Sequence, residues 1–421
     1  MAQWAERGRG GGGMLARAAA LGAAVLAAAA AGAAGAAGRY GPQSGPYAVG
    51  DASAVEVSGI GGASAHPALL WEPVRGSAEE AEEPEKWPVL VFAHGMCGTP
   101  ELYSDSIKVA ASWGYIVLAN KDQIECQSVD LGAIFSSSLS SVGDFYEASN
   151  STRMIENLSA EITWIYRELE DADTDRIALV GHSMGGGTSV DVAAALSTKY
   201  PGMVKAVVGI APWNGANPTP SSVVSQLDAP ILLFCSMADQ ICPCHGPALN
   251  SFNNAFTRFT ANNVFLPMLF PNYDGGITWK GGVDAIYNNA PPSPASDAAL
   301  NSTGSKVLIE VKDVGHLTIA GVGSGAQMEE VISQISGVLP ASIRPILSDP
   351  PGRDESSEPE VPTWSYAMAF LNGILGVPGA PEGMPSRAPG ESTADVLQAL
   401  TEAAADDPSI SNVFHEISAE N

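Results

Sequence analysis

Basic residues are scarce in this sequence. Its 421 residues include 20 lysines and arginines against 46 aspartates and glutamates, which gives a formal net charge of −26. A protein that binds nucleic acid needs clustered cations to neutralise the phosphates. The composition therefore excludes a nucleic-acid partner.

Long apolar runs are missing beyond the N-terminal segment, so we expect no membrane span in the mature chain, because a spanning helix needs about 18–20 apolar residues. Residues 1–37 combine Arg7, Arg9 and Arg17 with an alanine-rich run and small residues around Ala34–Ala37. This pattern is typical of a secretory signal peptide. We expect a secreted protein; a transit peptide for a plastid or other organelle lumen, or an uncleaved anchor, is the alternative.

Cysteine is also rare, and the sequence has an odd number of these residues. The five are Cys97, Cys126, Cys235, Cys242 and Cys244. An odd set forms at most two intramolecular bridges and leaves one thiol, and the sequence does not fix the pairing. The Cys-Pro-Cys run lacks a second ligand pair at zinc spacing, so the sequence predicts no metal site.

Short apolar runs typical of buried strands alternate with segments of helical spacing. The strand-like runs are WPVLVFA, YIVLANK, RIALVG, VKAVVGIA, APILLFC and KVLIEVKD. Such alternation favours crossover connections, and it predicts an α/β fold with a mostly parallel central sheet and helices on both faces. We expect one catalytic domain over residues 47–376. Residues 377–421, rich in Pro, Gly, Ala and acidic groups, are expected to form a weakly ordered tail with a short helix in TADVLQALTEAAA.

One serine stands between a predicted strand and a predicted helix. Gly181 and Gly185 flank His182, Ser183 and Met184 in a G-x-S-x-G motif that follows RIALVG. Such a strand–turn–helix context is typical of a nucleophile elbow, in which the turn is too sharp for side chains on either flank. A glycine-rich packing turn with a bystander serine is the alternative.

A nucleophilic serine needs a histidine base and an acid that orients it. In a fold with a nucleophile elbow, the acid follows the serine along the chain and the histidine comes last. His316 lies in the loop after the strand-like KVLIEVKD, and Asp239 is the only carboxylate just after APILLFC. Asp228 precedes that strand and Asp274 lies in an irregular loop. We therefore expect a Ser183–Asp239–His316 triad.

The oxyanion of an acyl-transfer intermediate needs two backbone donors. The residue after the nucleophile, Met184, is the first candidate, and Met96 in the loop after WPVLVFA is the second. The segment 272–297 is long for a connector between the acid and the histidine. It is either a lid or substrate wall, or a loop without a role in the site.

From Trp87 to about Gly376 the chain resembles the α/β-hydrolase branch of cutinases and polyester (PET) hydrolases, with chlorophyllases and platelet-activating-factor acetylhydrolases as relatives. Four ordered motifs carry the resemblance: DTDRIALVGHSMGGGTS, GIAPW, SMADQICP and VLIEVKDVGH. It implies a cofactor-free serine ester hydrolase in which Trp213 lines the substrate cleft. Two positions depart from these families: Met96 replaces the usual aromatic of the polyester branch, and Met184 replaces the usual arginine of the chlorophyllases.

The expected function is hydrolysis of a carboxylic ester of a small molecule, lipid or polymer, of cutinase, polyesterase or lipase type. Chlorophyllase-like and acetylhydrolase-like esterases share this chemistry and stay open. Peptide cleavage, thioester cleavage or acyl transfer is a different chemistry on the same fold. A non-catalytic binding protein of the same fold is the alternative from another class. The sequence does not fix the oligomeric state.

Overall fold

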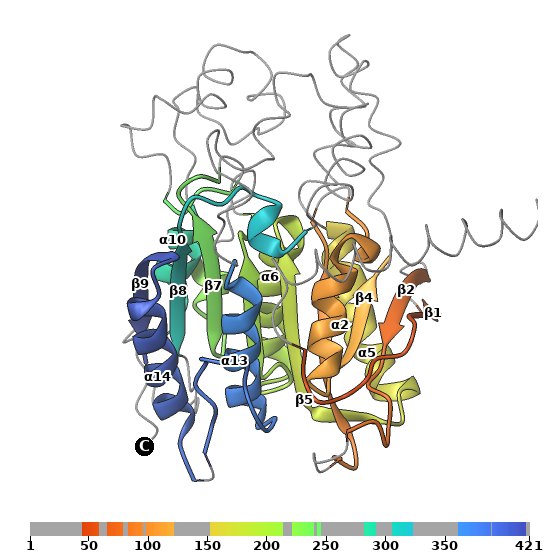
Figure 1. Ribbon diagram of the computed structural model, residues 1–421. Coiled ribbons are helices and arrows are strands. Elements are labelled where there is room, and N and C mark those ends of the chain that lie inside the picture. The colour runs from red at the N-terminus through yellow and green to blue at the C-terminus, as the bar shows by residue number, and fades with distance from the viewer. Residues whose placement is uncertain are drawn as a thin grey trace, which may run out of the picture.

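A computed structural model gives the fold. It describes residues 44–58, 65–78, 83–95, 98–121, 152–213, 221–239, 242–245, 282–291, 305–322, 361–388 and 390–417. Within this part of the chain, nine strands form one sheet in the order β1-β2-β4-β3-β5-β6-β7-β8-β9 (Figure 1). The strands are β1 (Ser53–Val57), β2 (His66–Trp71), β3 (Trp87–Ala93), β4 (Ile116–Asn120), β5 (Ala172–His182), β6 (Ala206–Ile210), β7 (Ile231–Ser236), β8 (Lys306–Val311) and β9 (Ile410–Glu416).

The centre of the sheet is parallel and its two flanks are antiparallel. Strands β4, β3, β5, β6, β7 and β8 run in one direction. The antiparallel pairings are β1 with β2, β2 with β4, and β8 with β9. Every residue of β3, β4, β6, β7 and β8 is buried, as expected for strands covered on both faces.

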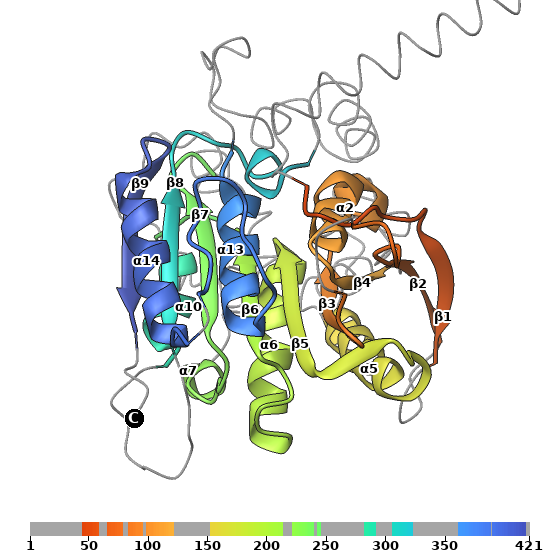
Figure 2. The same cartoon turned by 60° about the horizontal axis from the view of Figure 1, so that its bottom comes forward.

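Helices cover both faces of the sheet (Figure 2). Helices α2, α13 and α14 pack into the core on one face, and α5, α6, α7 and α10 pack on the other. Their bounds, with two 3-10 turns, are η1 (Pro100–Tyr103), α2 (Ser104–Ser112), α5 (Thr152–Glu168), α6 (Met184–Lys199), α7 (Ser221–Val224), α10 (Val283–Asn289), η2 (Thr318–Ala320), α13 (Thr363–Leu375) and α14 (Thr393–Asp406). This arrangement confirms the predicted α/β class with a mostly parallel sheet.

The prediction of a weakly ordered tail from residue 377 is wrong. The short helix expected there is present as α14, and β9 pairs with β8 along the edge of the sheet. Leu397 and Leu400 of α14 are fully buried. The Ser392 hydroxyl accepts a hydrogen bond from the Asp395 N–H, and the Asp395 carboxylate accepts one from the Ser392 N–H. This capping box and the apolar face of α14 outweigh the acidic composition.

The predicted signal peptide over residues 1–37 lies outside the described residues, as does most of the segment 272–297, of which residues 282–291 are described and contain α10. Among the helices that the structure describes, none combines the length and the apolar character needed to cross a membrane.

Candidate active site

The predicted site residues follow strands that end at one edge of the sheet. Register pairs His182 of β5 with Ile210 of β6, and Ile210 with Phe234 of β7. The pairing of β7 with β8 continues to Ser236 and Val311. Since the carboxyl ends of neighbouring parallel strands meet at one edge, the loops that follow them converge there, where α/β folds place their ligand sites.

Ser183 occupies the turn between β5 and α6 in a strained backbone conformation, with φ 56° and ψ −122°. Its carbonyl accepts a hydrogen bond from the Trp213 N–H at 2.7 Å. A Cβ added at Gly181 would overlap the carbonyl of Gly185, and one added at Gly185 would overlap the carbonyl of Ala93. Glycine is therefore required on both flanks of this turn, and a strained residue there is characteristic of functional sites.

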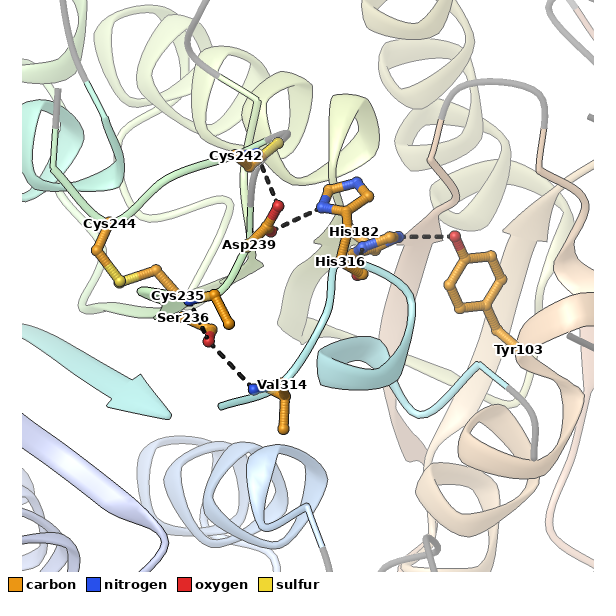
Figure 3. A network of polar contacts seen from close by, with 10 residues as sticks. Tyr103, His182, Cys235, Ser236, Asp239, Cys242, Cys244, Val314 and His316 are labelled. Carbon is orange, nitrogen blue, oxygen red and sulfur yellow. Dashed lines mark hydrogen bonds and ion pairs between the residues drawn. A yellow bond between two sulfur atoms is a disulfide. The ribbon is translucent and has the colours of Figure 1, made fainter. Parts of the chain in front are cut away.

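Asp239 and His316 form a buried hydrogen-bonded pair. The Nδ1 atom of His316 lies 2.7 Å from Oδ2 of Asp239. The other carboxylate oxygen, Oδ1, accepts the backbone N–H of Cys242 at 3.0 Å (Figure 3). Asp239 is 1% exposed and His316 4% exposed, so water does not compete strongly for this contact. The carboxylate thus fixes the orientation of the imidazole.

Ser236 and a disulfide hold the loop that carries Asp239. The Ser236 hydroxyl accepts hydrogen bonds from the N–H groups of Ala238 and of Val314, the latter from the loop that carries the histidine. Cys235, at the end of β7, is bridged to Cys244. The nine-residue separation between the two cysteines contains the whole acid-bearing turn, which is therefore clamped at both ends.

Cys242 is a free, buried thiol beside the predicted triad. Burial raises the pKa of this thiol well above its ordinary value, and the Asp239 carboxylate raises it further, while a hydrogen bond with the Ser183 side chain acts in the opposite direction. The thiol therefore stays protonated near neutral pH. Through Cys242, Ser183 lies next to the Asp239–His316 pair.

The remaining predicted residues are placed less completely. Met184 is the first residue of α6, where backbone N–H groups are not used within the helix. Trp213 is half-buried and packs against the core that contains α13. Met96 lies outside the described residues. Its role as an oxyanion donor stays a prediction, as do the catalytic roles of the other residues.

Sequence reasoning missed four residues of this site: Tyr103, His182, Ser236 and Cys242. His182 and Cys242 contact the predicted residues His316 and Asp239 directly. Tyr103 contacts His182, and Ser236 contacts Val314 in the loop that carries His316. The one local signal was the position of Ser236, three residues before Asp239, since serine hydroxyls commonly accept backbone N–H groups in turns. The contacts of Tyr103 and His182 depend on tertiary approach.

One group of described residues has the spacing of metal ligands, Cys235, Cys244 and Glu310, whose donor atoms lie within 4.8 Å of one another. Metal binding requires thiolates. The two cysteines are joined in a disulfide, so this group does not fit a metal ion in the oxidised protein.

Comparison with known families gives one match. Residues 72–240 match the chlorophyllase family model. The matched range is less than half of the chain, and it includes β3, the Ser183 turn and Asp239. With the nine-stranded, mostly parallel sheet covered on both faces, this match identifies the α/β-hydrolase fold. It supports a chlorophyllase-like hydrolase in general terms, and it does not confirm the cutinase and PET-hydrolase branch. No curated protein matches the chain.

Proposed function

We propose that this protein is a serine hydrolase of carboxylic esters. Ser183 is the nucleophile, His316 the base, and Asp239 the acid that orients His316. The observation that carries the proposal is the buried 2.7 Å contact of His316 Nδ1 with Asp239, beside a serine in a strained turn at the start of α6. The chlorophyllase match over residues 72–240 supports an ester as the substrate.

The hydrogen bond that His316 makes to Asp239 determines which of its ring nitrogens acts as the base. Asp239 accepts the Nδ1–H of His316, so Nε2 is left as the atom that removes the proton of Ser183. The Ser183 oxygen attacks the ester carbonyl, and the N–H groups of Met184 and Met96 bind the resulting oxyanion. His316 then protonates the leaving alcohol, and water releases the acyl group. No cofactor is needed for these steps.

Among the described residues, Cys242 is the rival nucleophile, because its thiol shares a hydrogen bond with the Ser183 side chain. Only a thiolate attacks esters efficiently. Burial and the Asp239 charge raise the pKa of this thiol, so Cys242 stays protonated near neutral pH. This favours Ser183.

The proposed substrates are esters of the cutinase, polyesterase and lipase type. Chlorophyll is a second candidate because the family match names chlorophyllase. A panel of p-nitrophenyl esters of graded acyl length, polyester oligomers, chlorophyll and an acetylated phospholipid ranks these substrates by kcat/KM. Amides and thioesters in the same panel test the alternative chemistries.

The nucleophile is tested with a fluorophosphonate probe and two serine variants. Ser183→Ala is expected to abolish both labelling and ester turnover. Ser189→Ala is the matched control, since Ser189 is a buried serine of α6, the helix that follows Ser183, and donates to the Gly185 carbonyl. If the purified protein is neither labelled nor active on any ester, the non-catalytic binding protein becomes the better explanation.

We also propose that residues 1–37 direct export. Fusion of this segment to a reporter enzyme is expected to deliver the reporter outside the cell, and delivery to an organelle would favour the transit-peptide alternative.

A further inference from the structure

A chain of buried hydrogen bonds connects the loop after β3 to the loop that carries His316. The N–H of Gly95 donates to the Tyr103 hydroxyl oxygen at 3.2 Å. The Tyr103 oxygen lies 2.8 Å from Nδ1 of His182, and Nε2 of His182 lies 2.9 Å from the backbone carbonyl of His316 (Figure 3). All of these contacts are buried.

The chemistry of the two ends fixes the direction of every bond in this chain. A backbone carbonyl can only accept, so Nε2 of His182 carries the proton that reaches His316. Nδ1 is then a bare acceptor, and Tyr103 O–H donates to it. The Tyr103 oxygen still has a lone pair for the Gly95 N–H. Both ends therefore require the same tautomer of His182.

The environment keeps His182 neutral. Burial lowers its pKa well below the ordinary value, and the neighbouring His316 and His94 act in the same direction, against the hydrogen bond to the His316 carbonyl. Burial also raises the pKa of Tyr103, although the Gly95 hydrogen bond opposes this. Both groups thus hold a single protonation state over the pH range in which an esterase works.

We propose that Tyr103 and His182 form a positioning relay. Tyr103 orients the His182 ring, and this ring holds the main chain of His316 in place beside the turn that carries Ser183. The inference rests on the proposed function. Asp239 holds the imidazole of His316 from one side. His182 holds the His316 carbonyl and packs against its ring at a tilt of 40°, with centroids 4.6 Å apart. Two anchors therefore locate the base relative to the nucleophile.

The relay also accounts for two residues of the sequence motifs. His182 belongs to the strand that delivers Ser183, so the base loop is tied directly to the nucleophile turn. A Cβ at Gly95 would be tightly placed, because it would lie 3.2 Å from the Ser183 Cβ and from Nδ1 of His182, and these neighbours would have to shift. Its N–H is engaged by the Tyr103 hydroxyl oxygen.

Tyr103→Phe removes only the hydroxyl and is the main test. We expect kcat to fall roughly tenfold with KM nearly unchanged, because a misplaced base slows the chemical step and leaves substrate binding intact. The rate of fluorophosphonate labelling is expected to fall by the same factor. Tyr115→Phe is the matched control, since Tyr115 is also fully buried and its hydroxyl donates to Asn372 at 2.8 Å, on α13. It is expected to lower the melting temperature but not kcat.

Two His182 variants provide a rescue test. Glutamine keeps an amide N–H that reaches toward the His316 carbonyl, whereas leucine has no donor. We expect kcat to decrease in the order wild type, His182→Gln, His182→Leu, at temperatures where all three are folded. Equal activity of the two variants, or wild-type kcat and labelling in Tyr103→Phe, overturns the relay.

A spectroscopic readout separates failure of the relay from failure of the proposed function. In protein with 15N-labelled histidine, His182 is expected to show a protonated Nε2 and a bare, hydrogen-bonded Nδ1 at neutral pH. Tyr103→Phe is expected to leave the proton on Nε2, which the His316 carbonyl still requires, and to shift the Nδ1 resonance because that atom loses its hydrogen bond. A proton on Nδ1 in the wild type overturns the relay even if the enzyme is active. If the wild type lacks esterase activity, the proposed function fails, and with it the catalytic purpose of the relay, while the tautomer still decides whether the hydrogen-bond chain exists.

Discussion

Asp239→Asn is the most informative change at the proposed site, because it keeps the shape of the side chain and changes only its hydrogen bonding. In the native protein, both carboxylate oxygens accept, one from His316 Nδ1 and one from the Cys242 N–H. An asparagine offers one acceptor and one donor. If its oxygen stays on Cys242, its NH₂ group faces His316 Nδ1.

That NH₂ group forces the proton of His316 from Nδ1 to Nε2, the atom that must accept the proton of Ser183. Loss of the correct tautomer in a Ser-His-Asp triad lowers kcat by about 10⁴-fold, which corresponds to about 5 kcal/mol of transition-state stabilisation. If the amide turns the other way, the buried Cys242 N–H loses its acceptor, which costs about 1–3 kcal/mol of folding stability.

The assay is kcat/KM on a p-nitrophenyl ester at neutral pH, together with the melting temperature. Asp228→Asn is the control, since Asp228 accepts hydrogen bonds from Ser197 and Gly202, outside the site. It is expected to keep wild-type kcat. A folded Asp239→Asn variant with activity within tenfold of the wild type would refute the assignment of Asp239.

Three further predictions follow from the same structure. Reduction of the Cys235–Cys244 disulfide is expected to lower the free energy of unfolding by about 3 kcal/mol, from the closure of a short loop, and to reduce activity, measured by urea unfolding and ester turnover with and without a dithiol. Cys242→Ala keeps the backbone N–H on Asp239, so near wild-type labelling by fluorophosphonate is expected; loss of labelling would assign a chemical role to the thiol. Leu400→Ala in α14 is expected to destabilise the domain by about 2–5 kcal/mol, because this side chain is fully buried, and an unchanged urea midpoint would contradict the packing of the C-terminal segment.

Much of the fold could be predicted because the central strands are buried on both faces. Such strands leave continuous apolar runs in the sequence, for example PILLFC, and these coincide with β3 to β8. Strand β9 could not be identified this way. Only its first residue is buried and five of the other six are exposed, as expected of an edge strand, so its sequence carries no comparable signal.

The positions of Ser183, Asp239 and His316 could be predicted because each follows a strand or lies in a turn with local sequence requirements. The hydrogen-bond chain through His182 could not. Its partners are 79 residues apart in one contact and 134 in the other. Such contacts depend on how closely two loops approach, which local sequence does not determine.

The pairing of β8 with β9 has a consequence for how the protein reaches its native state. The two strands are Lys306–Val311 and Ile410–Glu416, so about a hundred residues intervene before one edge of the sheet can be covered. Until then, a fully apolar stretch such as VLI in β8 presents open backbone groups, and open edges recruit strands from other molecules. Refolding yield is therefore expected to fall as protein concentration rises, until the C-terminal segment of α14 and β9 docks and covers this edge.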